Sequence, residues 1–444
     1  MKKLDKKWKL LIYGIAGMGV NMLNLMMGSY LCSAILIGGF GEAAIPYQTF
    51  EQRDLVVAGV WATFVLVAKI IDGVIDIPMA SMTDNMKTRW GRRRPALLMG
   101  LVPMIASYLL FLVCPNPLEA GIGNTIYYGV MLCVFYISYT LVMVTYYATF
   151  TEITDNEADR SFISNVKSVC DIVYFILGYV LVAGMLKGTN IRTVAVIMLP
   201  IVATMLIPFF LIKEDSTLEK DAGKRQSASK TVSLTKSLIY TLKNNNFIKW
   251  MFVYSIMQFS IQLFLSGINE YFSKTGMNMM MVMMAAFAPV PFTLIIYNKL
   301  KQKKGFGFAM RYVLIIYAIG MFLMFGAGLI DAGGLKTALA IASGVIASFG
   351  IGALFSVAYS IPAQLAAEDE EKTGISHSAM YFAVQGLFAG IATGIGSGAV
   401  LTALKEAGNA MVYMTLISGI GMFVSLALTF LLPKSLINLG KVNK

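Results

Sequence analysis

Three ionisable side chains stand within one otherwise apolar stretch of the sequence: Lys69, Asp72 and Asp76. Spacings of three and four residues place them on one face of a helix. One lysine and two carboxylates leave a net charge of about −1, which Na⁺, Li⁺ or a single shared proton would balance. Thr140 could supply a hydroxyl ligand to the same cation. The alternative is a closed ion-pair network that ties helices together and takes a second basic residue from elsewhere.

The stretch that carries these charges belongs to a chain suited to lipid. Of its 444 residues 57% are apolar and only 14% are charged, and the mean hydropathy is +0.70. A soluble domain needs a charged surface that this composition cannot supply. A β-barrel is the poorer interpretation, because its spans would alternate over only about 10 residues. Runs of about 20 apolar residues instead predict an all-α membrane protein with twelve transmembrane helices, at residues 10–38, 55–82, 96–114, 124–150, 168–186, 192–212, 247–271, 276–297, 312–330, 337–361, 376–404 and 409–432.

Basic residues between the predicted spans indicate how the chain crosses the membrane. Lys and Arg gather in alternate connections, beginning with the N-terminal segment, and the positive-inside rule places these connections in the cytoplasm. We therefore predict a multi-pass protein of the plasma membrane with both termini cytoplasmic. The net charge of +12 follows from this topology, so nucleic-acid binding is not implied.

The longest polar stretch divides the chain into two parts with six predicted spans each. We predict an N-terminal half at residues 1–212, a basic cytoplasmic loop at 213–246 and a C-terminal half at 247–444. Transporters built from two repeats place the solute between the halves, near the middle of the membrane. The sequence holds no Walker-type, G-x-S-x-G or HExxH motif, so no ATP-driven pump, hydrolase or cofactor is expected. Uphill transport would then depend on an ion gradient.

Other polar residues in or near the spans each have two interpretations. Asn21 and Asn24 share a helix face and suit a polar site or hydrogen bonds between helices. His377 is interpreted as a helix cap or solvent-facing group rather than a proton relay. The cysteines fall in or at the ends of spans and are interpreted as packing residues without disulfides. A group of tyrosines offers the rings and hydroxyls that sugars bind, with packing as an equal alternative: Tyr136, Tyr139, Tyr146 and Tyr147.

Two further patterns concern movement between the halves. Gly386, Gly390, Gly394 and Gly398 share one face of the eleventh predicted span, where a neighbouring backbone could approach for tight packing or for sliding. The acidic run at 368–371 is predicted to lie in a cytoplasmic loop. It could pair with a basic turn and close the cytoplasmic side of the transporter. The alternative is that the acidic side chains are only solvated. The cytoplasmic gate would then include Asp84, Arg89, Arg92, Arg93 and Arg94.

The sequence around the charged trio resembles that of a known transporter family. Residues 69–84 carry a basic residue followed by spaced aspartates, and residues 88–95 read Thr-Arg-Trp-Gly-Arg-Arg-Arg-Pro. A second stretch, Ala-Glu-Asp-Glu-Glu-Lys-Thr-Gly at 367–374, precedes the eleventh span. Together these motifs resemble the glycoside–pentoside–hexuronide:cation symporters, a melibiose-permease-like group of the major facilitator superfamily.

The resemblance implies a major-facilitator fold and coupled transport of a monovalent cation, Na⁺ or H⁺, with a sugar, glycoside or hexuronide. By matched position it implies that Asp72, Asp76 and Thr140 bind the cation, and that the two aspartates could hold Na⁺. Lys69 is then the charge partner of these carboxylates. The residues expected to contact the solute are Asn21, Asn24, Tyr147, Lys167 and Lys372.

Departures from the family pattern fall mainly on the solute site. Ile75 stands where galactoside-transporting members have an asparagine ligand, and the proline after the second aspartate is displaced to Pro78. Two sugar-binding aspartates of the family fall on Asn21 and Met143. Galactosides are therefore expected to bind poorly, and retained lysines favour an anionic solute such as a uronide. The alternatives are a family branch that moves a non-sugar such as a lysolipid, and a non-transporting membrane receptor or scaffold.

Overall fold

Every regular element in the described part of the chain is a helix. The computed structural model describes residues 6–37, 47–84, 86–154, 157–218, 234–331, 333–373, 378–439 and 441. Within these residues, ten helices are long and apolar enough to cross a membrane. A bilayer offers no water to backbone N–H and C=O groups, so a spanning segment must satisfy them internally, as an α-helix does. The predicted all-α membrane protein is confirmed.

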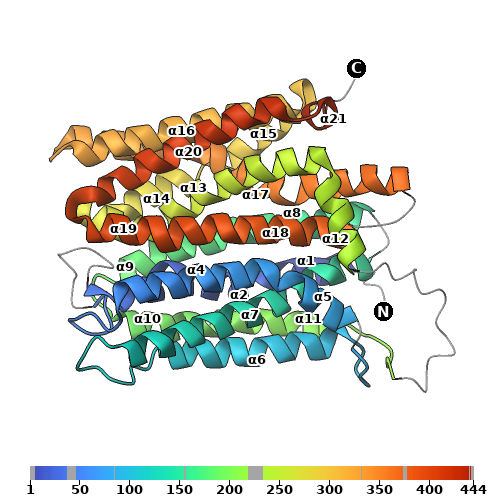
Figure 1. Cartoon of the computed structure of the whole chain (residues 1–444), viewed down its shortest axis with the longest axis horizontal. Coiled ribbons are helices and arrows are strands. Elements are labelled where there is room, and N and C mark those ends of the chain that lie inside the picture. The colour runs from blue at the N-terminus through green and yellow to red at the C-terminus, as the bar shows by residue number, and fades with distance from the viewer. Residues whose placement is uncertain are drawn as a thin grey trace.

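Two of the twelve predicted spans fall outside those ten helices for physical reasons. The second predicted span is divided into α4 (Ala58–Val74) and α5 (Asp76–Asp84), which are 17 and 9 residues long. The fifth contains α8 (Glu157–Ile176), whose first turns are polar, so that only Val169–Met185 form an apolar helix. Both nevertheless run beside the other helices of the bundle (Figure 1).

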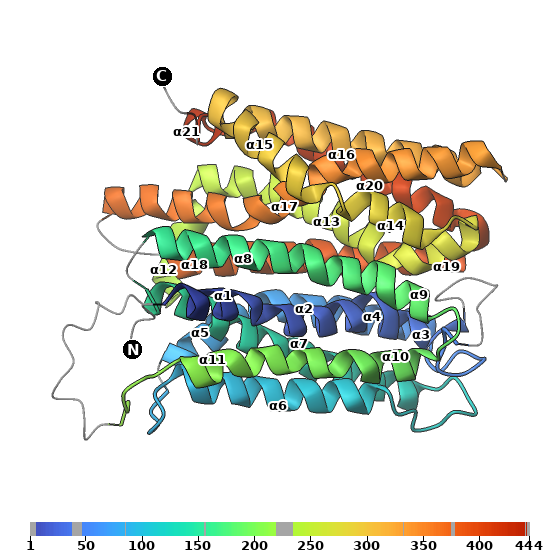
Figure 2. The ribbon, with the colours of Figure 1, turned by 180° about the vertical axis from the view of Figure 1, so that it is seen from behind.

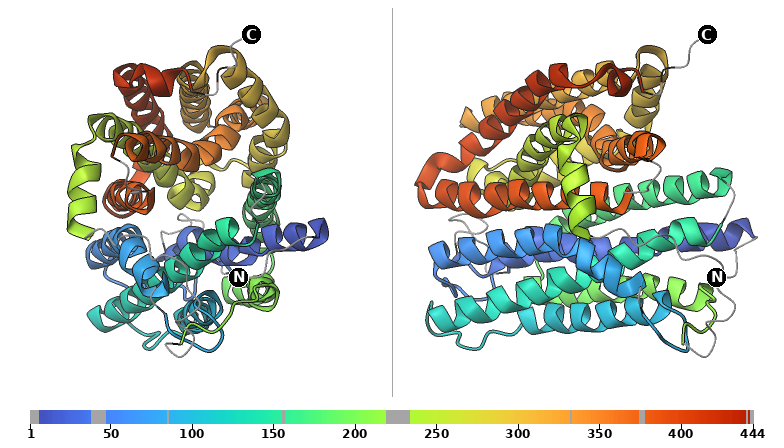
Figure 3. Two further views of the ribbon diagram at one scale, coloured as in Figure 1. Left: turned by 90° about the vertical axis from the view of Figure 1, so that its right-hand side faces the viewer. Right: turned by 45° about the vertical axis from the view of Figure 1, so that its right-hand side comes forward.

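The helices form two layers that follow the order of the chain (Figure 1, Figure 3). The first layer includes α4, α5 and α8, and α8 borders the second layer. Its other elements are α1 (Lys7–Ile15), α2 (Gly17–Leu25), the π-helical η1 (Met26–Leu31), α3 (Cys32–Ala34), α6 (Arg93–Phe111), α7 (Ile122–Glu152), the π-helical η3 (Leu177–Val182), α9 (Ala183–Met185), α10 (Ile191–Met198), the 3₁₀ helix η4 (Leu199–Met205) and α11 (Leu206–Leu211). The second contains α12 (Leu234–Lys243), α13 (Asn245–Thr275), α14 (Met279–Phe287), α15 (Val290–Lys304), α16 (Phe306–Leu329), α17 (Gly334–Thr373), α18 (Ser378–Gly394), the π-helical η6 (Ile395–Val400), α19 (Leu401–Glu406), the 3₁₀ helix η7 (Gly408–Val412), α20 (Tyr413–Leu428), the 3₁₀ helix η8 (Thr429–Leu431) and α21 (Lys434–Ile437).

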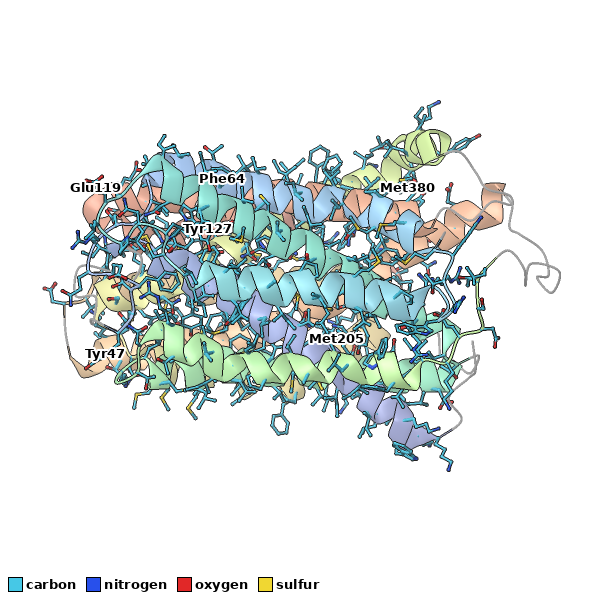
Figure 4. The ribbon with its side chains drawn as sticks, turned by 90° about the horizontal axis from the view of Figure 1, so that it is seen from below. Tyr47, Phe64, Glu119, Tyr127, Met205 and Met380 are labelled. Atoms are coloured by element: carbon cyan, nitrogen blue, oxygen red, sulfur yellow. The ribbon has the colours of Figure 1, made fainter. Side chains whose placement is uncertain are left out.

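Connections between the helices lie at the two ends of the bundle. Tyr47 and Glu119, from two connections that the sequence predicts to be external, lie at one end, and Met380 lies toward the other (Figure 4). The start of α1, α12 and α21 gather at the end opposite to α9, α10 and α19 (Figure 1, Figure 2). The first and last described helices therefore lie on the same side of the bundle.

The outer surface of the bundle is apolar and its interior contains polar groups. Large side chains such as Val102, Phe292 and Phe430 are 64%, 70% and 65% exposed. By contrast, Asn21 and Glu270 are buried inside the bundle. This distribution matches a protein whose solvent is lipid and whose function depends on polar residues inside it.

Two charged stretches outside the predicted spans are helical, one of them the acidic run that the sequence analysis placed in a loop. The acidic run at 368–371 lies in the last turns of α17, and the basic stretch that follows the eighth span belongs to α15 up to Lys304. The apolar runs mark the part of a helix that faces lipid. Residues such as Ala, Glu, Lys and Gln favour helix in water as well, so these helices continue past the apolar run.

Candidate cation and solute sites

The charged trio lies where one membrane helix is interrupted. α4 ends at Val74 and α5 begins at Asp76, with Ile75 between them. Pro78 has no backbone N–H and therefore cannot donate to the Val74 carbonyl four residues earlier. The missing hydrogen bond weakens the helix between Asp72 and Asp76, although the N–H of Ile75 still donates to the Ile71 carbonyl at 2.9 Å and that of Met79 to the Ile75 carbonyl at 3.0 Å.

Asp72 accepts a hydrogen bond from the predicted hydroxyl ligand. The Oγ1 atom of Thr140 on α7 donates to Oδ1 of Asp72 at 2.7 Å. Asp76 is close enough for its carboxylate to be repelled by that of Asp72. The structure thus places the Thr140 hydroxyl on Asp72, with the second carboxylate four residues further along the same span. Two carboxylates and a hydroxyl are a donor set for a small hard cation or a proton.

Lys69 balances these carboxylates less directly than expected. Its Nζ atom lies 4.0 Å from the centre of the Tyr136 ring on α7, a cation–π contact. Lys69 and Asp72 attract each other, but no direct ion pair of Lys69 occurs among the described residues. The closed ion-pair network considered from the sequence therefore has no second basic member within the described part of the chain.

Glycines bring the charged helix against α18 of the other layer. A Cβ atom added to Gly390 would lie 2.6 Å from the Lys69 carbonyl oxygen, and one added to Gly386 would lie 3.0 Å from Oδ2 of Asp76. Cβ atoms at Gly394 and Gly398 would lie 3.2 Å and 3.0 Å from α4 carbonyl oxygens. The close backbone approach predicted from the glycine spacing is confirmed, and its partner is α4, the helix that carries Lys69 and Asp72.

A second polar network surrounds Asp171 on α8. Nζ of Lys167 lies 2.6 Å from Oδ2 of Asp171, and Nδ2 of Asn21 donates to Oδ1 at 3.3 Å. The hydroxyl of Tyr139 donates to Oδ1 of Asn21 at 3.1 Å, and Lys167 lies 5.3 Å from the centre of the Tyr147 ring. Three of the residues predicted to contact the solute, Asn21, Tyr147 and Lys167, are therefore neighbours.

Asp171 was missed by the sequence analysis, although a signal for it existed. It is a carboxylate inside the fifth predicted span, four residues after Lys167, which is the spacing of an ion pair on one helix face. Asp171 also changes the interpretation of Lys167, because the charge of this lysine is already matched. Lys167 therefore does not favour an anionic solute.

Adjacent residues of α7 link the two networks. Thr140 donates to Asp72 of the cation site, whereas Tyr139 donates to Asn21 of the Asp171 network. Asn24 makes no side-chain hydrogen bond within the described part of the chain, and the side chain of Lys372, at the end of α17, lies outside it. His377 also lies outside the described residues.

Two of the predicted gate residues, Arg93 and Arg94, contact their own layer. The backbone N–H of Arg93 donates to Oε2 of Glu214 at 2.7 Å, and Nε of Arg94 donates to the Phe209 carbonyl at 2.9 Å. Gly91 has a φ of +83°, and a side chain there would collide with Glu214. Arg89 is exposed and Arg92 is half-buried, whereas the side chain of Asp84 lies outside the described residues. The role of these residues as a gate stays a prediction.

The Lys167–Asp171 pair leads to a testable expectation about stability. We expect Lys167→Gln and Asp171→Asn each to lower the melting temperature, because each leaves a poorly hydrated charge without its partner. The double variant should recover part of the loss, with a coupling energy of about 1–3 kcal/mol between the two sites. Thermal unfolding of the four purified proteins measures this, and strictly additive losses would contradict the pairing.

Comparison with known proteins agrees with this architecture of a multi-pass membrane protein. The sequence model of the MFS/sugar transport protein family matches residues 12–434. This match covers nearly the whole chain, so the protein belongs to that family, within the major-facilitator group of transporters. The solved nucleoside transporter NupG superimposes with a TM-score of 0.57 at 14% identity, over 97% of this chain and 98% of that one, and it shares the fold.

Two curated relatives from Escherichia coli (strain K12) match parts of the chain. The putative glycoside/cation symporter YagG is 26% identical over 229 residues, which are 50% of this chain and 47% of YagG. The glucuronide carrier protein homolog is 28% identical over 142 residues, or 30% of each chain. The chain therefore matches less than half the length of either relative.

Proposed function

We propose that this protein is a secondary transporter that couples Na⁺ or H⁺ to the uptake of a sugar, glycoside or hexuronide. It lies in the plasma membrane with both termini in the cytoplasm, and alternating access moves residues 1–212 against residues 247–444. The observation that supports this best is the position of the cation site. Thr140 donates to Asp72 on α4, and α4 is the helix that Gly386 and Gly390 of the other layer touch.

The position of the site gives a physical reason for coupling. Lys69, Asp72 and Asp76 together carry one uncompensated negative charge when no cation is bound. A net charge is costly in a low-dielectric interface that must rearrange. A bound Na⁺ or proton neutralises the trio beside the α4–α18 contact, so a change of conformation costs the loaded carrier less. A cation that binds one conformation of the carrier more tightly than the other shifts the population of carriers toward that conformation.

The Asp171 network supports a polar solute on the other side of α7. Carboxylate and amide oxygens accept hydrogen bonds from sugar hydroxyls, and the Tyr147 ring offers a face for packing. Tyr139 and Thr140 are consecutive residues, so a solute that moves Asn21 also acts on the helix that holds the cation. The names of the two relatives, a glycoside/cation symporter and a glucuronide carrier homolog, point to the same solute class.

Transport by the purified protein in proteoliposomes tests this function. We expect accumulation of a glycoside or hexuronide when a Na⁺ or proton gradient points inward, and none when the gradient is collapsed. Melibiose and simple galactosides should bind roughly a hundredfold more weakly than the preferred solute, because Asn21 and Met143 replace two charged acceptors. Robust melibiose transport would contradict the assignment of the solute site, and no gradient-driven accumulation of any solute in the panel would contradict the function.

A further inference from the structure

Hydrogen bonds join the two layers in the half of the bundle that the sequence predicts to be external. Nδ2 of Asn269 on α13 donates to the backbone carbonyl of Ser29 on η1. Oγ of Ser29 donates in turn to the Leu265 carbonyl of α13 at 3.3 Å. Ser29 and Asn269 are only 5% and 6% exposed. The first layer is therefore bonded directly to the second at a point that water does not reach.

An aromatic contact joins the same two layers beside these hydrogen bonds. The Phe287 ring of α14 stacks on Phe175 of α8 and on Tyr179 of η3, with ring centres 5.2 Å and 6.1 Å apart. Figure 2 shows α8 and α9, which flank η3, beside α14. The hydroxyl of Tyr179 lies 3.0 Å from Oγ of Ser29. Ser29 gives its one proton to the Leu265 carbonyl, so Tyr179 is the donor to Ser29. Tyr179 thus connects the aromatic contact to the polar one.

Both spans of the first layer that make these contacts depart from the α-helix where they make them. Ser29 belongs to the π-helical η1 and Tyr179 to the π-helical η3. π-helical turns are rare, and they occur frequently at functional sites. We call the four residues that join the layers here the outer clasp: Ser29, Tyr179, Asn269 and Phe287.

The outer clasp lies between the external end of the bundle and the candidate sites. Asn21 precedes Ser29 by eight residues in the same span, which at a rise of 1.5 Å for each residue is about 12 Å toward the cytoplasmic end. A cavity of about 180 Å³ borders the clasp, between Gly28 of η1 and Ser266 of α13, and its lining extends to the exposed Asp54. A solute that enters between the layers from outside therefore meets the clasp before it reaches Asn21.

We propose that the outer clasp is the external gate of the transporter, which is closed in this structure and opens when the carrier takes up solute from outside. This inference rests on the proposed transport function. When the layers part, water can replace the hydrogen bonds of Ser29, Tyr179 and Asn269, so their loss costs little net free energy. An entirely apolar contact would lose its burial without such a replacement. A polar clasp is therefore suited to open and close once in every cycle.

Thiol labelling from each side of the membrane tests the clasp without any transport. The reporter is Asn24→Cys, because Asn24 lies on the cytoplasmic side of Ser29 in the same span and its side chain is partly exposed. A membrane-impermeant cationic methanethiosulfonate is added to right-side-out or inside-out vesicles, so that it meets either the external or the cytoplasmic face. The native thiols are removed by Cys32→Ser, Cys114→Ser, Cys133→Ser and Cys170→Ser.

Two variants each remove one hydrogen bond of the clasp. Tyr179→Phe keeps the ring that stacks on Phe287, and Asn269→Ala leaves the Ser29 carbonyl without its donor. We expect each variant to raise the labelling rate from the external face about three- to tenfold, because the closed conformation loses a hydrogen bond that the open one does not have. Labelling from the cytoplasmic face should not rise, because the same change depopulates the conformation that is open to that face.

Matched controls remove comparable groups that bond within one layer. The hydroxyl of Tyr271, two residues from Asn269, donates to the Met324 carbonyl at 2.7 Å, and the Asn124 amide donates to the Asn116 carbonyl at 2.7 Å. Tyr271→Phe and Asn124→Ala should change external labelling less than about twofold, because neither bond distinguishes the two conformations. Unchanged external labelling in both clasp variants would overturn the inference. An equal rise in the controls, or from both faces, would also overturn it, because it would indicate general loosening.

Solute accumulation in the same variants separates this inference from the proposed function. If the wild-type protein accumulates solute but the clasp variants leave external labelling unchanged, the gate is refuted and the function stands. If labelling responds as expected while no solute in the panel accumulates, the clasp is supported as a gate and the proposed solute class fails.

Discussion

Proteoliposomes that contain Asp72→Asn or Asp76→Asn are expected to show no ion-driven solute accumulation. Asparagine keeps the shape of aspartate but removes the charge that attracts the cation. A carboxylate contact to an ion contributes about 1.5–3 kcal/mol, so each variant should lose at least about tenfold in cation affinity. Lys69 and the remaining acid would then form a neutral pair without any bound ion, and coupling would be lost.

Folding of these two variants should be preserved. In Asp72→Asn, the side-chain amide oxygen can still accept the hydrogen bond that Thr140 donates at 2.7 Å in the structure. Removing a charge from a membrane helix also lowers its cost of insertion. A matched control is Asp215→Asn, which removes an exposed carboxylate outside the helices and should leave accumulation unchanged. Accumulation that survives both single replacements would show that Asp72 and Asp76 have only a structural role.

The residues of the proposed cation site were largely recognisable in the sequence, because charge inside an apolar helix is costly and therefore conspicuous. Lys69, Asp72 and Asp76 stand out for this reason, and the family resemblance added support for Thr140, whose hydroxyl does reach Asp72. The partner of Lys69 was not predictable. The contact between Lys69 and the Tyr136 ring joins two helices whose rotation about their axes no local pattern determines.

The proposed solute site shows where such reasoning fails. Asn21 and Lys167 were found by matched position, yet their common partner Asp171 stands on a position that the family pattern did not mark. Glu270 and Lys405 were also missed, because they are 135 residues apart and lie near the ends of their spans, where charged side chains are ordinary. Only the packing of α13 against α18 and α19 shows that Glu270 is buried between Lys405 and Lys274, whose Nζ atoms lie 3.2 Å and 3.5 Å from its carboxylate.

The contact between α4 and α18 leads to the second large expectation. A methyl group at Gly73 would collide with the backbone of Gly386, and such overpacking costs about 1–3 kcal/mol. Gly59 stands in the same helix, and a methyl group there would meet nothing within 4 Å. We expect Gly73→Ala to lower the melting temperature and to abolish most of the accumulation, whereas Gly59→Ala should match or exceed the wild-type protein in stability.

The two glycine variants share one change in helix propensity, so their difference isolates the contact between layers. Alanine favours a helix over glycine by about 0.5–1 kcal/mol at both positions, and only Gly73→Ala must also push α18 away from the helix that carries Asp72 and Asp76. If the contact matters mainly for movement, transport should fall more than equilibrium binding of the cation does. Thermal unfolding, cation binding and initial uptake rates are measured on both variants. Equal stability and equal uptake would show that α4 and α18 do not approach this closely in any state that limits transport.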